Sequence, residues 1–209
     1  MASPKLRRSV FAFSIVTAVL LLGIASIASA QGAPGFHIGI SGGADIPVQD
    51  QSDVFNVGWN GTLMFVWNFG SSPFGVRLDG SYHELTAKDE LVLFTDGKTR
   101  IIDGTFDFVI GPHVGPYVQP YILGGVGAYD MKFSGTDLTF DEIFSDSTTR
   151  FGWNAGTGIA FRVGDTTQTH LFFEGRYTSI STDGNRFTDS VTTGGRRFTM
   201  IVVNTGVVF

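Results

Sequence analysis

The sequence predicts an all-β chain: an eight-stranded antiparallel up-and-down transmembrane β-barrel with short periplasmic turns and long extracellular loops. Three observations predict it. An apolar leader opens the chain, segments of alternating apolar and polar residues follow, and these segments are joined alternately by short Gly/Pro turns and by long polar loops. The 28 glycines, the 20 phenylalanines and the scarcity of helix-length periodic segments favour strands over helices.

Residues 1–30 have the three parts of a secretory signal peptide. Basic residues within the first eight positions precede an apolar run over residues 10–27, and small residues then lead to Ala30. An uncleaved membrane anchor is the alternative, but the apolar run falls short of the roughly 20 residues that a membrane helix needs. We therefore predict export through the inner membrane, cleavage after Ala30 and one barrel domain over residues 31–209.

Composition narrows the classes of function. Without the three basic residues of the leader, the chain keeps 11 basic residues against all 19 acidic ones, a formal charge of −8. Nucleic-acid binding needs clustered Lys and Arg, so no nucleic-acid partner is expected. The chain has no cysteine, so an exported domain must be held by its core or by a closed hydrogen-bond ladder. A soluble exported β-domain and a transmembrane barrel remain.

The first two predicted strands span residues 36–46 and 55–69. Phe36, Ile38 and Ile40 alternate with polar or small residues in the first, which Pro47 ends. A polar loop follows. The second strand alternates bulky apolar residues with small and polar ones most clearly, and a short Gly/Pro turn ends it.

The third and fourth strands are predicted over residues 74–82 and 101–110. Each sets aliphatic or aromatic residues on one face against charged or hydroxyl residues on the other, the pattern of a strand between two environments. A long loop over residues 84–100 separates them.

The fifth and sixth strands are predicted over residues 117–131 and 151–162. Three glycines make the facing of the fifth strand ambiguous, whereas in the sixth Trp153 and its apolar neighbours oppose Asn154 and two glycines. A second long, acidic loop over residues 133–150 lies between them.

The last two strands are predicted over residues 170–178 and 198–209. The seventh carries Glu174 and Arg176 on its polar face. The eighth is rich in β-branched residues, lacks proline and ends on Phe209, whose ring we expect at a water–lipid boundary.

The composition of the two faces predicts which one meets lipid. The polar face is rich in Gly, Ser, Thr and Asn and carries scattered charges of both signs, which suits a narrow lumen. A soluble exterior is normally Lys-rich, yet the lysines beyond the leader are only those at positions 88, 98 and 132. The predicted lumen charge network is Arg77, Asp79, Asp103, Asp107, Arg162, Glu174 and Arg176. We expect these charges to fill the lumen structurally, and a gate is the alternative. The predicted aromatic girdle, on the lipid-facing side, is Trp59, Trp67, Phe69, Tyr82, Trp153, Phe161 and Tyr177.

The motifs FGWNAGTGIAF at residues 151–161, PYILGGVGAY at 120–129 and FEGRY at 173–177, together with the closing Phe209, resemble the outer-membrane β-barrel domain family. This is the small eight-stranded group around the OmpA membrane domain, OmpX and OmpW. The resemblance covers nearly all of residues 31–209 and rests on patterns rather than on catalytic motifs. It implies a cell outer membrane location, and hence a diderm (Gram-negative) bacterium.

The resemblance also implies partners. In this family the last strand is recognised by the barrel-assembly machinery, so Phe209, with Val207 and Val203 on the same face, is the expected assembly signal. Outer-membrane lipids are the other expected partners, and a monomer is the expected state. No peptidoglycan-binding domain is seen after the barrel, which argues against the wall-anchoring role of longer members.

The sequence gives only weak indications of a catalytic or metal-binding site. His83 and Glu84 lie where the third strand is expected to leave the membrane, with Asp103 or Asp107 on the neighbouring strand, but a solvated rim histidine is the favoured interpretation. The acidic stretch 137–146 offers hard oxygen ligands without the spacing of a calcium loop, and we expect a solvated loop. No hydrolase or metalloprotease motif is present, so we expect no catalytic residue, metal or cofactor.

These observations predict a non-enzymatic outer-membrane barrel with an envelope structural or surface-interaction role. A narrow channel for small or hydrophobic solutes is one alternative, and a rim enzyme acting on lipid or peptide is another. A soluble β-domain, with its aromatic face buried, is the structural alternative.

Overall fold

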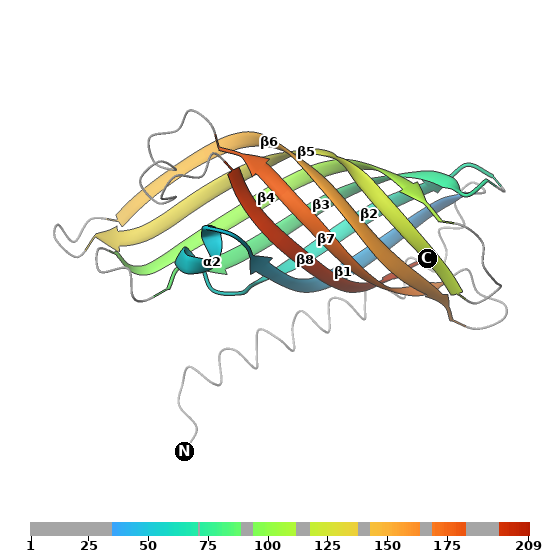
Figure 1. The fold of residues 1–209 in the computed structure, drawn as a ribbon, viewed down its shortest axis with the longest axis horizontal. Coiled ribbons are helices and arrows are strands. Elements are labelled where there is room, and N and C mark those ends of the chain that lie inside the picture. The colour runs from blue at the N-terminus through green and yellow to red at the C-terminus, as the bar shows by residue number, and fades with distance from the viewer. Residues whose placement is uncertain are drawn as a thin grey trace, which may run out of the picture.

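The computed structural model describes residues 35–70, 72–88, 94–111, 118–137, 143–163, 169–182 and 197–209. The predicted signal peptide lies outside these residues, so its cleavage stays a prediction. The described chain forms strands and one short helix (Figure 1). The elements are β1 (Phe36–Pro47), α2 (Gln51–Val54), β2 (Gly58–Asn68), β3 (Phe74–Thr86), β4 (Phe94–Ile110), β5 (Val118–Asp137), β6 (Ile143–Arg162), β7 (His170–Ser181) and β8 (Arg197–Val208).

The eight strands form one closed barrel in sequence order, each antiparallel to the next. The ring closes where β1 pairs with β8, in a register that runs from Gly39 opposite Val208 to Pro47 opposite Met200. Phe209 extends this seam, because its backbone N–H donates to the carbonyl of Ile38 at 2.8 Å. Closure satisfies the backbone groups that an open sheet edge would expose to hydrocarbon. The predicted eight-stranded up-and-down barrel is confirmed.

The apolar face of the barrel points outward. Trp59, Phe108 and Val126 are 54%, 62% and 64% exposed, whereas the inward-facing Met64 and Asp107 are buried. A water-soluble domain would bury its large aromatic residues, so a wall of exposed rings over a polar interior is the arrangement of a membrane barrel. No helix among the described residues is long and apolar enough to cross a membrane.

Two predicted loops are shorter than the sequence suggested. Residues 84–100 and 133–150 were expected as loops, but β3 continues to Thr86, β4 begins at Phe94, and β5 and β6 pair out to Thr136 opposite Ile143. The reason is physical. Beyond the bilayer a β-ladder still satisfies its backbone groups, while neither face needs to be apolar, so the alternation that reveals a strand is absent there.

The polar segment after β1 also holds an unexpected element. Residues 51–54 form the short helix α2, which contacts β1 and β8 and turns Val54 and the following Phe55 inward. The Phe55 ring meets the Phe198 ring edge-on, with centroids 5.8 Å apart. The apolar plug formed at this end of the lumen comprises Val54, Phe55, Leu85, Ile101, Tyr129, Ile180, Phe198, Met200 and Val202.

Candidate functional site: the lumen

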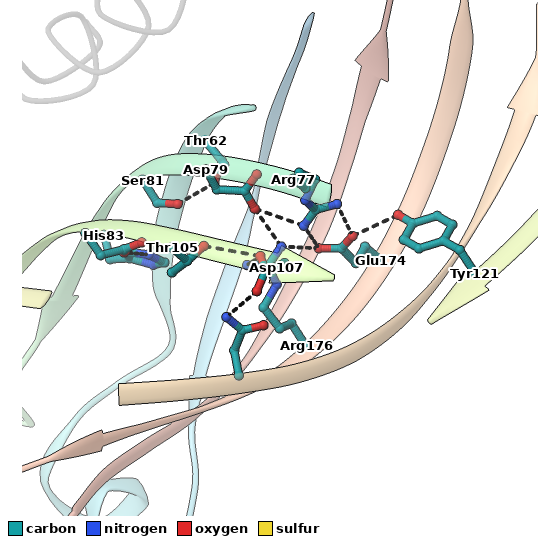
Figure 2. Close-up of polar contacts among 12 residues, drawn as sticks. Thr62, Arg77, Asp79, Ser81, His83, Thr105, Asp107, Tyr121, Glu174 and Arg176 are labelled. Atoms are coloured by element: carbon teal, nitrogen blue, oxygen red, sulfur yellow. Dashed lines mark hydrogen bonds and ion pairs between the residues drawn. The ribbon is translucent and has the colours of Figure 1, made fainter. Parts of the chain in front are cut away.

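The middle of the lumen holds a network of ion pairs, the central ion network, made by Arg77, Asp79, Asp107, Glu174 and Arg176 (Figure 2). The Arg77 guanidinium contacts Glu174 twice, Nη1 to Oε2 at 2.7 Å and Nη2 to Oε1 at 2.9 Å. Arg176 Nη2 lies 2.8 Å from both Asp79 Oδ2 and Glu174 Oε1, and its Nη1 lies 3.3 Å from Asp107 Oδ2. All five residues are buried.

Strand geometry explains why these residues meet. Residues two apart on a strand share a face, so Arg77 and Asp79 point inward from β3, and Glu174 and Arg176 point inward from β7. The β3–β4 register places Asp107 directly opposite Arg77. In an eight-membered ring β3 and β7 lie on opposite sides, so the network ties opposite walls of the barrel together.

Neighbouring strands supply further hydrogen bonds. The hydroxyl of Tyr121 on β5 donates to Glu174 Oε2 at 2.8 Å, and the amide of Asn154 on β6 donates to Asp107 Oδ1 at 2.8 Å. Glycine makes room for both. A Cβ on Gly158 would meet the Tyr121 ring, and a Cβ on Gly125 would meet the Asp107 carboxylate. The sequence did not single out Tyr121, because the glycines of its strand hid which residues face inward.

A second cluster, the His83 cluster, lies nearer the plug and comprises Asp45, Asn60, His83 and Asp103. His83 Nδ1 is 2.9 Å from Asp45 Oδ2, and its Nε2 is 2.8 Å from Asp103 Oδ2. The Asn60 amide donates to the other oxygen of Asp45 at 2.9 Å. Asp103 was predicted in the charge network, but the structure places it here, against the histidine ring.

The expectation of a solvated rim histidine is wrong. His83 is 4% exposed, because the plug covers it on the side that leads to the long loops. Glu84 points outward instead, with Arg100 Nε at 3.4 Å and Lys98 Nζ at 3.9 Å. Adjacent residues on a strand face opposite ways, so His83 and Glu84 do not form a pair at one rim site.

Arg162, like Asp103, was predicted in the charge network but lies apart from the central ion network. It is exposed and faces the lumen at the short-turn end, opposite His170 in the β6–β7 register. It lines a cavity of about 370 Å³, the vestibule, whose lining also includes Arg77, His37 and Tyr121. A cavity between the two polar clusters, lined by His83, Thr105 and Arg176, has a volume of about 10 Å³, roughly the room for one water molecule.

The predicted girdle residues lie on the outer wall at two levels. Trp59 packs on Tyr82, and Trp153 on Tyr177, with ring centroids 5.4 and 5.5 Å apart, toward the long-loop end. Trp67, Phe69 and Phe161 lie on segments that reach the short-turn end. Two aromatic bands on a barrel are typical of the two interfaces of a membrane.

The residues of the expected assembly signal lie on β8, which pairs with β1 on one side and with β7 on the other. Val203 is exposed on the outer wall, and Val207 pairs with Ile40 of β1 and Leu171 of β7. The Phe209 carbonyl accepts from the Ile38 N–H at 3.3 Å and lies 3.2 Å from His37 Nδ1. Their role in assembly stays a prediction.

The acidic stretch 137–146 falls largely outside the described residues, and the side chains at its two ends are not described either. Within the described ranges, no group of three or more His, Asp or Glu side chains is placed to hold a metal ion.

Comparisons with known proteins agree with this architecture. The family model described as the outer membrane protein beta-barrel domain matches residues 15–209. A comparison with the curated proteins found no match.

Several solved structures share the fold. Neisserial surface protein A is 17% identical with a TM-score of 0.55, covering 85% of this chain and 98% of that one. A major outer membrane protein from Thermus thermophilus is 14% identical with a TM-score of 0.56, covering 83% and 98%. Ail from Yersinia pestis, in complex with the heparin analogue sucrose octasulfate, is 16% identical with a TM-score of 0.50, covering 83% and 97%. With the closed barrel and its exposed aromatic wall, the family match shows that this chain is a protein of the cell outer membrane and belongs to the outer membrane protein β-barrel domain family.

Proposed function

We propose that this protein is a non-conducting, non-enzymatic barrel that serves an envelope structural or surface-interaction role. The observation that carries the proposal is the filled lumen. The inward residues of β4 pass from Asp107 in the central ion network through the buried Thr105 to Asp103 in the His83 cluster and then to Ile101 in the plug. A solute would have to displace all three layers.

The polar layers are costly to open. Each guanidinium of the central ion network contacts at least two carboxylates, and removing one partner from a buried pair typically costs about 3–5 kcal/mol. The apolar plug closes the other end with rings in contact. These features favour a structural filling over the gate that we considered as its alternative.

The side-chain arrangement also argues against a rim enzyme. His83 is the histidine that the sequence placed beside carboxylates, and it is enclosed between Asp45 and Asp103 with no adjoining space for a substrate among the described residues. A general base must reach the proton that it abstracts, directly or through one water. Glu84 lies on the other side of the wall.

The outer parts of β5 and β6 support a surface role. Each strand has 20 residues, about twice the 9–11 that cross a membrane. In the described register, β6 pairs with β7 only from Gly152 onward, so residues 143–151 pair with β5 alone. On its other side β5 stays paired with β4 out to Phe94 opposite Asp137, so β4, β5 and β6 form a three-stranded extension that projects past the closed ring at the long-loop end (Figure 1).

Conductance in planar bilayers tests the closed lumen. We expect no discrete current steps from a preparation whose heat-dependent mobility on a gel shows that it is folded. Reproducible ohmic current steps from that folded preparation would contradict a closed lumen and favour the narrow channel.

Deletion tests the surface role. A chain in which residues 132–147 are replaced by Asn-Gly, a turn that joins the register partners Met131 and Thr148, removes the projecting ends of β5 and β6 and keeps the closed ring. We expect it to fold and reach the outer membrane but to lose attachment of the cells to surfaces or to one another. If attachment is unchanged and outer-membrane leakage rises as much as in cells lacking the protein, the role is structural.

A further inference from the structure

The vestibule at the short-turn end is a chamber of about 370 Å³ inside the closed barrel. Its volume lies at the lower end of the range of small-molecule sites, which is about 300–1,000 Å³. Met64, Phe172 and Val208 contribute apolar side chains to its wall. The central ion network lies below it, because Arg77 and Tyr121 belong to its lining and both contact Glu174. The vestibule is therefore a blind chamber with a polar floor.

Arginine and histidine residues gather in the lining of the vestibule, and carboxylates do not. Arg77, Arg162, His37 and His170 line it, and none of the described residues in its lining is Asp or Glu. The chain has 19 acidic residues against 14 Lys and Arg, so the composition of the protein runs the other way. A chamber with low-dielectric walls that is lined by basic groups focuses their field and attracts anions.

Arg162 is the group available to a ligand. Two other basic residues of the vestibule already have partners. Arg77 is paired with Glu174 and Asp79, and the His37 ring contacts the Phe209 carbonyl. Arg162 is exposed, and no ion pair to it is found among the described residues. A guanidinium offers a planar fork of donors that matches a carboxylate.

We propose that the vestibule binds a small organic carboxylate with an apolar body, which enters from the periplasmic side and pairs with Arg162. The apolar body lies against Met64 and Phe172, and the carboxylate stays at the rim. It stays there because the central ion network holds three carboxylates against two guanidinium groups and so repels a deeper anion. This inference is independent of the surface role, because it concerns the opposite end of the barrel.

Methionine methyl NMR on the folded protein in detergent tests the site, with sodium benzoate as the probe. Met64 lines the vestibule, whereas Met200 belongs to the plug and serves as an internal reference. We expect saturable shifts of the Met64 methyl signal and none at Met200. Benzamide, which is neutral and of the same shape, should bind at least tenfold more weakly, and inorganic phosphate should also bind more weakly because it has no apolar part.

The matched variants are Arg162→Gln and Arg100→Gln. Both remove one exposed arginine, but Arg100 lies on the outer wall beside Glu84. Arg162→Gln should weaken benzoate binding at least tenfold, and Arg100→Gln should leave it unchanged. Equal binding of benzoate and benzamide, equal binding by the two variants, phosphate binding as tight as benzoate, or shifts confined to Met200 would each overturn the proposal. Conductance is measured separately, so a failure here leaves the closed-lumen proposal standing.

Discussion

Arg77 and Glu174 form a two-point ion pair across the full width of the barrel, with contacts of 2.7 and 2.9 Å between side chains that start 97 positions apart. The pair joins β3 to β7, on opposite sides of the ring. A fork-to-fork contact of this kind fixes both distance and orientation, so it sets the width of the lumen as well as filling it.

Replacing Glu174 with glutamine should destabilise the barrel strongly. The change keeps the shape of the side chain but removes the charge that both buried arginines contact, at an expected cost of about 1.5–3 kcal/mol, since each arginine keeps another carboxylate partner. The measurement is the urea midpoint of unfolding in lipid vesicles, followed by tryptophan fluorescence. Glu84→Gln is the matched control, because Glu84 makes partly exposed pairs on the outer wall worth about 0–1 kcal/mol. Equal losses in the two variants would contradict the assigned role of the network.

The His83 cluster should show coupling between its members. His83→Gln leaves Asp45 and Asp103 buried without the ring that bridges them, and should lower the unfolding midpoint. Adding Asp45→Asn removes one of the two like charges and should recover part of the loss. A double-mutant cycle measured by thermal unfolding should give a coupling of about 0.5–3 kcal/mol. Strict additivity of the two changes would mean that the histidine does not bridge the carboxylates.

Position 125 should tolerate only glycine, because neighbouring atoms leave no room for a side chain. A Cβ there would meet the backbone carbonyl of Phe106 and the Asp107 side chain, and a backbone atom cannot move aside cheaply. Gly125→Ala should cost about 1–3 kcal/mol, as overpacking does. Gly104→Ala is the control, since a Cβ at Gly104 meets no atom within 4 Å. The measurement is the midpoint of unfolding of both variants in the same detergent. A Gly125→Ala variant as stable as Gly104→Ala would show that the barrel wall shifts to accommodate the methyl group.

Phe209 should matter more for assembly in cells than for stability. Phe209→Ala should lower the amount of folded protein in the outer membrane several-fold, while the purified variant refolds in detergent about as well as the parent. The control is Phe173→Ala, which removes an exposed ring from the outer wall at a position outside the last strand. Mobility on unboiled gels gives the folded fraction in both settings. If the two alanine variants assemble alike, Phe209 carries no special signal.

Much of the fold was predictable because, in a membrane barrel, the environment of each side chain alternates along the strand. Each spanning residue meets either lipid or a narrow lumen, so the period-two pattern located all eight strands and distinguished the face of Trp59 from that of Asn60. The same rule placed Arg77, Asp79, Asp107, Glu174 and Arg176 inside before any contact was known. It did not work beyond the bilayer, where β5 and β6 continue without an apolar face.

The sequence by itself thus determined the fold class, the two faces of every strand except the fifth, and most of the lumen charges, although it missed Asp45. Only the tertiary structure decided which charges meet, because height in the lumen depends on the pairing of all eight strands. Arg77 and Arg162 have the same facing, yet one is buried among carboxylates and the other lies exposed in the vestibule. His83 is buried because α2, a helix of four residues, brings Val54 and Phe55 over the lumen, and so short an element has no periodic pattern to reveal it.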